Sequence, residues 1–384
     1  MLLGFSAQGI YSLGKKVDLN FVARPKTRLG NTKYEENFFL NQRHKGMKTA
    51  VFFGSNASGK TNLFLAIKAL KNILEYGLKN ELKTESDRLF FKGNYQIFLS
   101  ISVGDNEGNL FDYEICFDAD GMIIEEKLFK NKKNVFIYED SSLSSSIFIK
   151  NDSFEQFRKM IEVSRPNGAT MIEILSNLAQ FGEVKDFLKC IDTIEVHDKD
   201  HFSKESDLSL NERAKKFFQE HRARVLQLFK IIDQSIDDFN FQLYDREGEE
   251  RYRLVILRNG NEFQLKTESE GIKKIVKLSI PLIQAIGEGR TVIVDELDSS
   301  ITTLTLIELF NSFVNVCDNQ KGQLIISSHN LLLFDVSFLN SQQIFLVQKD
   351  DDLCTFVKSY YEYDVRSDKK QAYIDYLNGA YDGE

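Results

Sequence analysis

Proline is scarce in this 384-residue sequence, which contains three prolines and no tryptophan. So few prolines argue against long rigid linkers and disordered tails. The cysteines are also few, and no two of them form a C-x-x-C pair: Cys116, Cys190, Cys317 and Cys354. This spacing suggests neither a zinc ribbon nor a disulfide framework, and it favours reduced thiols in a cytosolic protein.

Long hydrophobic runs are missing as well. No apolar run in the sequence reaches the roughly 18 residues that indicate a membrane-spanning helix. The N-terminal segment lacks the charged start and the long apolar block of a signal peptide. We therefore expect a soluble, cytoplasmic protein with no membrane partner.

Basic residues are outnumbered, 49 against 57 acidic ones, and the formal charge is −8. This balance argues against a protein that binds nucleic acid over its whole surface, although a local basic groove stays compatible with it. Hydrophobic residues make up 42% of the chain, which is enough for a sizeable core. The length suits one large domain or two modest ones.

The hydrophobic pattern predicts strands and helices in alternating regions. Two short strands are expected within residues 1–22, and the unalternating run TAVFF at 49–53 is typical of a strand buried on both faces. Alternating strands over 89–148 indicate an antiparallel sheet. Residues 154–194 are expected to be mainly helical. The remaining predicted elements are a helix at 61–76, a helix at 211–235, strands at 237–245 and 252–265, a helix at 271–286, a strand at 291–298, a helix at 302–316, a strand at 322–330 and a hairpin at 342–360.

The clearest chemical signal is GSNASGKT at 54–61, a complete match to G-x-x-x-x-G-K-[ST]. A buried strand before it and a helix after it form the setting of a phosphate-binding loop. Glycines let the backbone approach phosphate oxygens, and N–H groups at the helix start face the anion. Lys60 would reach the β- and γ-phosphates, and the Thr61 hydroxyl would bind Mg²⁺. The predicted nucleotide-binding residues of this segment are Gly54, Ser55, Asn56, Ala57, Ser58, Gly59, Lys60, Thr61 and Asn62.

A second signal is TVIVDELD, in which a buried-type strand leads to Asp295 and Glu296. A carboxylate at the end of such a strand can hold Mg²⁺, and a second one beside it can polarise the attacking water. We expect Asp295 and Thr61 to be the metal ligands. An acidic pair at a solvated strand end is common, so the interpretation depends on the phosphate loop.

A third signal is QLIISSHN, an apolar strand that ends at His329. A histidine at the carboxyl end of a strand in an open α/β sheet lies near the crevice where ligands bind. We expect it to sense the γ-phosphate, although an isolated histidine in a turn usually has no such role.

Between these motifs, TESEGIKK opens a predicted helix, with Thr267 and Ser269 as candidate caps. A serine and a glycine, Ser269 and Gly271, at a helix start can bind an anion. From the residues alone, an ordinary capped helix is the simpler interpretation.

In this order the motifs resemble those of ABC-type ATPase heads of the SMC and RecF kind. Within that class the sequence is most similar to AAA-type ATPases related to the overcoming-lysogenisation-defect proteins. The stretches that carry the likeness are the N-terminal strand pair, GSNASGKTNL, TESEGIKK, VIVDELDSSI, LIISSHN and the closing segment from QQIFLVQKDDD to YEYDVRSDKK. The likeness is weakest between residues 90 and 250. It implies an α/β, ABC-type P-loop ATPase head that uses ATP and Mg²⁺.

We expect one ABC-type ATPase domain over residues 1–384. Residues 1–90 and 250–384 would form the nucleotide-binding core with a mixed or parallel sheet. Residues 91–150 would form an antiparallel β subdomain, and residues 151–249 a mainly helical insertion.

The resemblance also implies roles for single residues. Ser269 and Gly271 match the signature that caps the γ-phosphate of ATP held by another protomer, and Asp298 matches the loop that couples two protomers. Glu296 matches the catalytic base and His329 the switch histidine, which with the loop lysine complete the expected catalytic set. ATP would then join at least two heads, and hydrolysis would release them.

Some features depart from the family. SSITT follows Asp298 where relatives often carry a histidine and a proline, which affects the expected contact between protomers. Gln180 is a candidate for the glutamine that reports the γ-phosphate, and a helical surface glutamine is the alternative. Only about 50 residues follow His329, too few for the C-terminal nuclease domain that such relatives often carry. The effector, a nuclease or toxin, is therefore expected to be a separate chain.

Three functions stay open. The first is an ATP-driven sensor and scaffold of a bacterial antiphage system that controls this separate effector. The second is a DNA-repair ATPase of the RecF kind that binds DNA directly, which the acidic charge and the lack of a long heptad pattern disfavour. The third is a nucleotide-gated adaptor without turnover, which the Asp-Glu pair disfavours.

Two further patterns are weaker. His197 and His201 in HDKDH could be a metal pair, but the segment is more typical of a solvated polar loop. The SSLSSS run at 141–146 is expected to be a loop.

Overall fold

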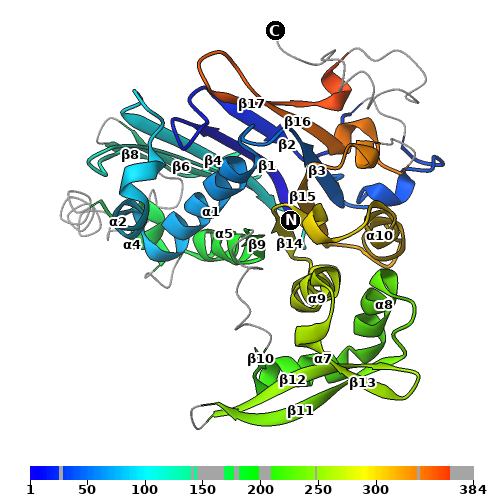
Figure 1. Cartoon of the computed structure of the whole chain (residues 1–384). Helices are drawn as coiled ribbons and strands as arrows, with labels where there is room; N and C mark the ends of the chain where they lie inside the picture. The colour runs from blue at the N-terminus through cyan, green and yellow to red at the C-terminus, as the bar shows by residue number, and fades with distance from the viewer. Residues whose placement is uncertain are drawn as a thin grey trace.

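The computed structural model describes residues 1–25, 29–139, 142–144, 168–176, 181–198, 209–246, 249–334 and 338–363. Three β-sheets and the helices packed on them make up this part of the chain (Figure 1). The mixed α/β fold expected from the sequence is confirmed.

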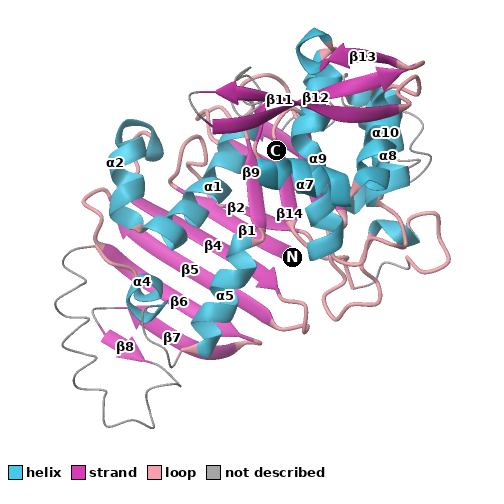
Figure 2. Ribbon diagram, turned by 90° about the horizontal axis from the view of Figure 1, so that it is seen from below, coloured by secondary structure: helices cyan, strands magenta, loops and turns pink. Residues whose placement is uncertain are grey.

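An antiparallel sheet joins the N-terminal strand pair to the predicted β region. Its strands are, in spatial order, β2 (Val17–Asn20), β1 (Leu2–Gln8), β4 (Gln96–Gly104), β5 (Leu110–Asp118), β6 (Ile123–Lys130), β7 (Lys133–Glu139) and β8 (Ser142–Ser144). Every second residue of β5 is buried, beginning with Phe111 and Tyr113, because successive side chains point to opposite faces. The helices that cover the buried face are α1 (Lys60–Tyr76), α2 (Leu78–Leu89), α4 (Met171–Ser176) and α5 (Gly182–Asp192) (Figure 2).

A second sheet, mainly parallel, carries the sequence motifs. Its strands are, in spatial order, β17 (Thr355–Ser359), β16 (Ile344–Lys349), β3 (Thr49–Phe53), β15 (Gln323–Ser328), β14 (Thr291–Val294) and β9 (Ile194–His197). Only the β16–β17 pairing in this sheet is antiparallel. All residues of β3, β14 and β15 are buried, as the unalternating apolar runs predict.

The parallel sheet separates two hydrophobic cores. Ala50 and Phe52 of β3 pack into the core shared with the antiparallel sheet, whereas Val51 and Phe53 pack into the core on the opposite face. Because β3, β14 and β15 are parallel neighbours, their carboxyl ends meet at one edge of the sheet.

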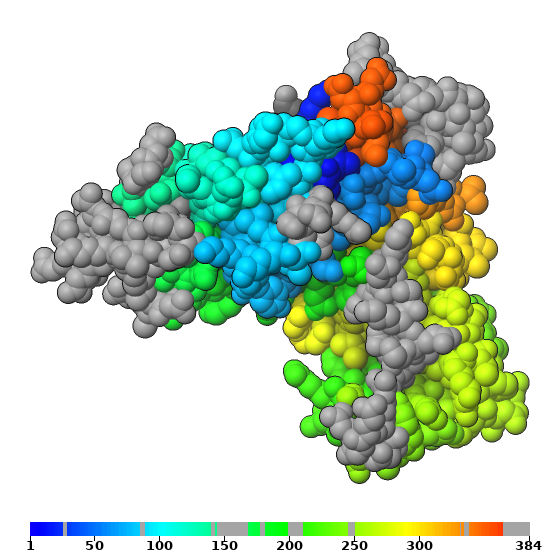
Figure 3. All heavy atoms as spheres, turned by 60° about the vertical axis from the view of Figure 1, so that its left-hand side comes forward, coloured from blue at the N-terminus to red at the C-terminus, as the bar shows by residue number. Residues whose placement is uncertain are grey.

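A third, smaller sheet projects from the rest of the molecule (Figure 3). Its strands are β10 (Ser209–Leu210), β11 (Asp238–Arg246), β12 (Glu249–Arg258) and β13 (Asn261–Gln264). The helices associated with it are α7 (Glu212–Glu220), α8 (Arg222–Ile232) and α9 (Glu270–Glu288), and α10 (Thr303–Leu309) packs beside α8. Helix α9 returns the chain to β14 of the parallel sheet.

Several local predictions were wrong. The helix predicted over 211–235 is two helices that meet at His221, because α7 packs on β12 whereas α8 packs on α9. The predicted loop of serines contains β8, which pairs with β7. The predicted helical region does not reach residue 194, since Ile194–His197 pair with β14 as β9. Strand pairing across the fold decides these short segments, whose own preference is weak.

Two helices also differ from the sequence-based boundaries. Leu78–Leu89 form α2, for which no element was predicted. The helix predicted over 302–316 ends as α10 at Leu309, and Phe310–Val314 continue it as a wider π-type turn.

The sheets cut across the division of the chain expected from the sequence. Strands β1 and β2, within residues 1–90, belong to the antiparallel sheet. Strand β9, within 151–249, belongs to the parallel sheet, and the expected boundary at 250 lies inside β12. Among the described residues, no helix combines the length and the apolar character needed to cross a membrane.

Candidate nucleotide-binding site

The loop at residues 54–61 lies between β3 and α1, as the sequence predicts. Its tip, Ser55–Ala57, is exposed, and the residues on both sides of the tip are buried. Gly59 has a φ of +107°, and a Cβ atom there would lie 2.0 Å from Thr355 Oγ1. A Cβ atom at Gly54 would lie 2.4 Å from the carbonyl oxygen of Val347. The loop therefore passes so close to the neighbouring hairpin that only glycine fits at both positions.

Helix α1 begins without a side-chain cap. Its N-cap residue is Gly59, no side chain of the described residues caps the first turn, and that turn contains no acidic residue. The first N–H groups of a helix have no intrahelical partner. The start of α1 thus combines free donors with the positive end of the helix dipole, which suits an anion.

Lys60 lies almost completely buried between the loop and the end of β15. Its ammonium group donates to the carbonyl oxygens of Gly54 (2.7 Å) and Ser55 (2.9 Å) and lies 3.3 Å from His329 Nδ1. Burial lowers the pKa of Lys60 to about 8, because loss of water disfavours the charged form. The carboxylates that follow β14 attract the ammonium group and oppose this shift only in part.

Thr61 and Asp295 come together from α1 and the end of β14. The Thr61 hydroxyl donates to Asp295 Oδ2 at 2.7 Å, and Ser327 at the end of β15 donates to the other carboxylate oxygen. Two oxygens bound side by side to one octahedral Mg²⁺, each at about 2.1 Å, stand about 3 Å apart. The hydroxyl and the carboxylate therefore fit adjacent positions around such an ion.

Glu296 and His329 face each other at the carboxyl ends of β14 and β15. Glu296 Oε1 lies 3.6 Å from His329 Nε2, and both side chains are partly exposed. The other ring nitrogen of His329, Nδ1, lies 3.1 Å from the carbonyl oxygen of Gly54. The imidazole thus bridges the phosphate loop and the glutamate, and in its protonated form it can donate on both sides.

Asp298 ties the turn after β14 to the turn after β15. Its Oδ2 atom accepts from Ser328 Oγ (2.8 Å) and from the backbone N–H groups of His329 (3.0 Å) and Asn330 (3.1 Å). Its Oδ1 atom is buried and has no hydrogen-bond partner among the described residues. Half of the carboxylate is therefore used inside the chain, and the other half is left as an unmatched acceptor.

Ser269 and Gly271 stand at the start of α9. Ser269 is exposed and caps the helix, since its Oγ accepts from the backbone N–H of Ile272 at 3.4 Å. Gly271 is buried, and a Cβ atom there would lie 2.6 Å from the carbonyl oxygen of Ser300. No hydrogen bond joins Ser269 to the 54–61 loop in the described chain. Within one chain, the structure shows a capped helix that packs on the turn after β14.

Two residues outside every motif support the phosphate loop. Thr355 Oγ1 donates to the carbonyl oxygen of Ser58 at 2.9 Å and lies 2.8 Å from Ser12 Oγ. Asn62, predicted to bind nucleotide, donates its side-chain amide to Ser12 Oγ at 2.8 Å. No sequence motif marks Ser12 or Thr355, because each is a single hydroxyl residue far from the loop in the chain.

The remaining sequence candidates are His197, His201 and Gln180, and of these only His197 lies in a described segment, where its carbonyl oxygen accepts from the backbone N–H of Asp295 at 3.0 Å. His197 ends β9 and lies 3.4 Å from the Glu195 carboxylate. His201 and Gln180 lie outside the described residues, so the histidine pair and the glutamine stay untested. Within the described ranges, no group of three His, Cys, Asp or Glu side chains is placed to hold a metal ion.

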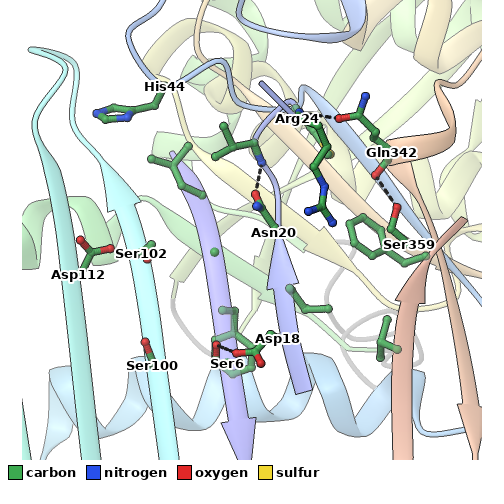
Figure 4. Close-up of a pocket in the computed structure, with 18 of the residues that line it drawn as sticks. Ser6, Asp18, Asn20, Arg24, His44, Ser100, Ser102, Asp112, Gln342 and Ser359 are labelled. Carbon is green, nitrogen blue, oxygen red and sulfur yellow. Dashed lines mark hydrogen bonds between the residues drawn. The ribbon is translucent and has the colours of Figure 1, made fainter. Parts of the chain in front are cut away.

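A cavity of about 480 Å³ opens over the exposed face of β1, β2, β4 and β5 (Figure 4). At its lining Ser6 donates to Asp18, and Arg24 pairs with Glu362 at 2.6 Å. None of its lining residues belongs to the 54–61 loop or to the turns after β14 and β15. This cavity is therefore separate from the candidate nucleotide-binding site.

Comparison with known proteins agrees with this architecture. Residues 50–335, most of the chain, match the family described as "AAA domain, putative AbiEii toxin, Type IV TA system". A search of curated proteins gives no match. Among solved structures, the chain is similar to the Smc head domain with a coiled coil and joint from Pyrococcus yayanosii, with 12% identity, a TM-score of 0.50 and coverage of 99% of both chains. The chain belongs to this AAA-domain family and has the fold of an ABC-type ATPase head.

Proposed function

We propose that this AAA-family protein binds and hydrolyses ATP with Mg²⁺ at the carboxyl ends of β3, β14 and β15. The observation that carries the proposal is the convergence of Lys60, the Thr61–Asp295 pair and the Glu296–His329 pair on one edge of the sheet. These groups supply an anion site, a metal site and a candidate general base within one cluster.

The phosphate loop would bind and orient the nucleotide. The uncapped start of α1 and the Lys60 ammonium group donate to the phosphate oxygens, and Ser55–Ala57 present the exposed tip of the loop to the ligand. Thr61 and Asp295 would hold Mg²⁺, which neutralises phosphate charge as it develops. Ser327 holds Asp295 in place, and the Ser12–Thr355 pair holds the phosphate loop in place, each through hydrogen bonds.

Glu296 is the proposed general base. Its carboxylate is partly exposed, so water can reach it, whereas Asp295 beside it is almost fully buried and bonded on both oxygens. His329 would orient Glu296 and report on the phosphate end of the loop, since its ring contacts both. A general base of this kind contributes typically 10²–10⁴-fold to the rate.

A second copy of the chain would complete the site. Ser269 is exposed at the start of α9, and the turn with Asp298 packs against that start, so both can face another head together. In this proposal Ser269 and Gly271 of a second copy cap the γ-phosphate, and Asp298 lies at the contact. ATP then acts as the link between two heads, and its hydrolysis separates them.

The biological role is proposed from the family. Its printed description names a toxin and a toxin–antitoxin system, and the motif order resembles the ATPases related to the overcoming-lysogenisation-defect proteins. We infer a cytoplasmic ATPase subunit of an antiphage system that holds or releases a separate nuclease or toxin according to its nucleotide state. We also propose the expected division of the sequence into a nucleotide-binding core, a β subdomain and a mainly helical insertion, with β1, β2 and β9 as the strands that pair across its boundaries.

The test of catalysis is Glu296→Gln, which keeps the shape of the side chain and removes the base. We expect kcat for ATP hydrolysis to fall about 10²–10⁴-fold, while ATP affinity in calorimetry stays within about twofold. Glu107→Gln, in the exposed turn between β4 and β5, is the matched control and should keep wild-type turnover. Unchanged turnover in Glu296→Gln would remove Glu296 from the role of base.

The same variant tests the biological role. Glu296→Gln should accumulate in the ATP-joined state, so affinity purification from the native host with Mg-ATP should recover a second protein in fixed ratio. Recovery of the chain alone, together with DNA-stimulated hydrolysis in the wild type, would instead favour an autonomous DNA-repair ATPase.

A further inference from the structure

Helix α9 holds the turn that carries Glu296 through a buried lysine. The Lys274 ammonium group donates to the carbonyl oxygen of Glu296 at 2.5 Å and to Ser299 Oγ at 2.9 Å. One turn earlier on the same helix, Gly271 lies directly against the carbonyl oxygen of Ser300. The first two turns of α9 thus contact both ends of the segment from Glu296 to Ser300.

The backbone of this segment is unusual at Glu296. Its φ of 49° and ψ of 50° lie in the left-handed region, which a non-glycine residue occupies only when its surroundings impose it. The carbonyl oxygen of Glu296 accepts from Lys274 and also from the backbone N–H of Ser299 at 3.1 Å. Because these bonds fix the peptide that follows Glu296, they also fix the direction in which its side chain leaves the backbone.

The buried position of Lys274 disfavours the charged form that makes this contact. Lys274 is 6% exposed, and burial lowers its pKa to about 8, although the carboxylates after β14 favour its charged form. Lys273, its neighbour on the helix, instead pairs with the exposed Glu270 at 2.8 Å and has a side chain that is 14% exposed. Two adjacent lysines of one helix therefore have different surroundings, and only Lys274 reaches the site.

We propose that Lys274 is a positioning residue that holds the left-handed turn at Glu296 and so connects the start of α9 to the general base of the same chain. This inference rests on the proposed ATPase function and deepens it. In the proposed assembly, the start of α9 meets the nucleotide of the other copy. Lys274 then makes the geometry of Glu296 in one site depend on the seating of α9 against the other site.

The experiment compares Lys274→Met with Lys273→Met in steady-state ATP hydrolysis and in calorimetric titration with a non-hydrolysable ATP analogue. A displacement of a catalytic group by about 1 Å costs on the order of 100-fold in rate. We therefore expect kcat to fall about 100-fold in Lys274→Met, with affinity for the analogue within about twofold of wild type. Lys273→Met should keep wild-type kcat.

A double variant separates positioning from general support of the fold. If Lys274 acts through Glu296, adding Lys274→Met to Glu296→Gln should change the residual kcat by less than about twofold. Independent effects would multiply, and that result would overturn the inference, as would wild-type kcat in Lys274→Met.

Should Lys274→Met fail to fold in a thermal melt, Ser299→Ala takes its place, because it removes one of the two acceptors. We expect lower kcat and unchanged analogue affinity in Ser299→Ala, and wild-type kcat there would overturn the inference.

The wild-type protein measured in parallel distinguishes the two proposals. A wild type that binds the analogue without hydrolysing ATP overturns the proposed function. Wild-type turnover together with full turnover in Lys274→Met overturns only the positioning role.

Discussion

The two helix starts that the sequence marks for phosphate binding, at α1 and at α9, differ in almost every physical respect. The start of α1 is capped by Gly59 without a side chain, has no acid in its first turn and buries Lys60. The start of α9 is capped by the Ser269 hydroxyl and carries the acidic Glu270 in its first turn. Both ends have the positive side of a helix dipole, but the Ser269 hydroxyl already accepts from one of the first N–H groups of α9, whereas the N-cap residue of α1 has no side chain to do so.

This difference suggests that the two helix starts bind phosphate under different conditions, one within a single chain and the other between two copies. The start of α1 is enclosed by β3, by the support of Ser12 and Thr355, and by His329, so it can form a phosphate site within one chain. The start of α9 is exposed, and its own cap already uses one N–H group. An anion there needs further groups around it, which a second copy of the chain can supply. The α1 site is thus expected to act in the monomer, and the α9 site only in an assembly.

The largest effect is expected from Lys60→Ala, which removes the cation at the start of α1. Charge-assisted hydrogen bonds are worth about 1.5–3 kcal/mol each, so the loss of two such bonds should weaken ATP binding by about 4 kcal/mol, roughly a thousandfold. Calorimetry with a non-hydrolysable ATP analogue on dilute, monomeric protein measures this affinity.

The matched change at the other helix is Ser269→Ala. If α9 contributes only in the assembly, this variant should keep the monomer affinity within about twofold and lose the ATP-dependent dimer seen by light scattering. A large loss of monomer affinity in Ser269→Ala would contradict the division between the two helix starts.

Alanine substitutions of Gly59 and Gly271 compare the two helix starts through the stability of the fold. Gly59→Ala places a methyl group 2.0 Å from Thr355 Oγ1 at a φ of +107°, so strain and overlap add, and we expect a loss of about 3 kcal/mol in the free energy of unfolding. Gly271→Ala meets the Ser300 carbonyl oxygen at 2.6 Å, but Ser299 and Ser300 are exposed and can shift. The loss there should be about 1–2 kcal/mol.

Urea unfolding measures both losses, and Gly287→Ala is the control. A Cβ atom at Gly287 would have no heavy atom within 4 Å, so alanine inside α9 should stabilise the protein by about 0.5–1 kcal/mol. Equal losses at Gly59 and Gly271 would mean that the phosphate loop is less rigid than its contacts indicate.

The parts of the site that the sequence predicted are those in which the signal is local. The loop at 54–61 and the acidic pair after β14 each consist of neighbouring residues. The fully buried strands β3, β14 and β15 are predicted by unalternating apolar runs. Parallel pairing then brings the loop, the acidic pair and His329 to one edge of the sheet.

The rest depends on contacts between distant segments. Ser12 and Thr355 are 343 positions apart and meet only because their hairpins pack on each other. The contact of Lys274 with Glu296 needs the left-handed turn, which no pattern in the sequence specifies. Strand β9 has four residues, too few for a periodic signal, and its pairing with β14 defines it. The roles of Ser269, Gly271 and Asp298 toward a nucleotide stay predictions, because they concern a second chain.

The last expected effect is a pH dependence that also distinguishes the two buried lysines. Burial lowers the pKa of Lys60 from its usual 10.5 to about 8, so the ammonium group of the free protein loses its charge above about pH 8. Affinity for the ATP analogue should then fall by about tenfold per pH unit between pH 8 and 9.5. Lys274→Met should show the same fall, because Lys274 contacts backbone and Ser299 rather than phosphate.

Stability should move in the opposite direction over the same range. The unfolded chain keeps the Lys60 proton up to about pH 10.5 whereas the folded chain has released it, so unfolding takes up a proton and this group adds stability as pH rises from 8 to 10.5. Urea unfolding at pH 7.5 and 9.5 measures the contribution of Lys60 to the free energy of unfolding. This contribution is the difference in pH dependence between wild type and Lys60→Met, which lacks the titrating group. If affinity falls above pH 8 while wild type and Lys60→Met show the same pH dependence of stability, the titrating group is on the nucleotide or on another residue. The anion site at the start of α1 would then depend on the helix N–H groups alone.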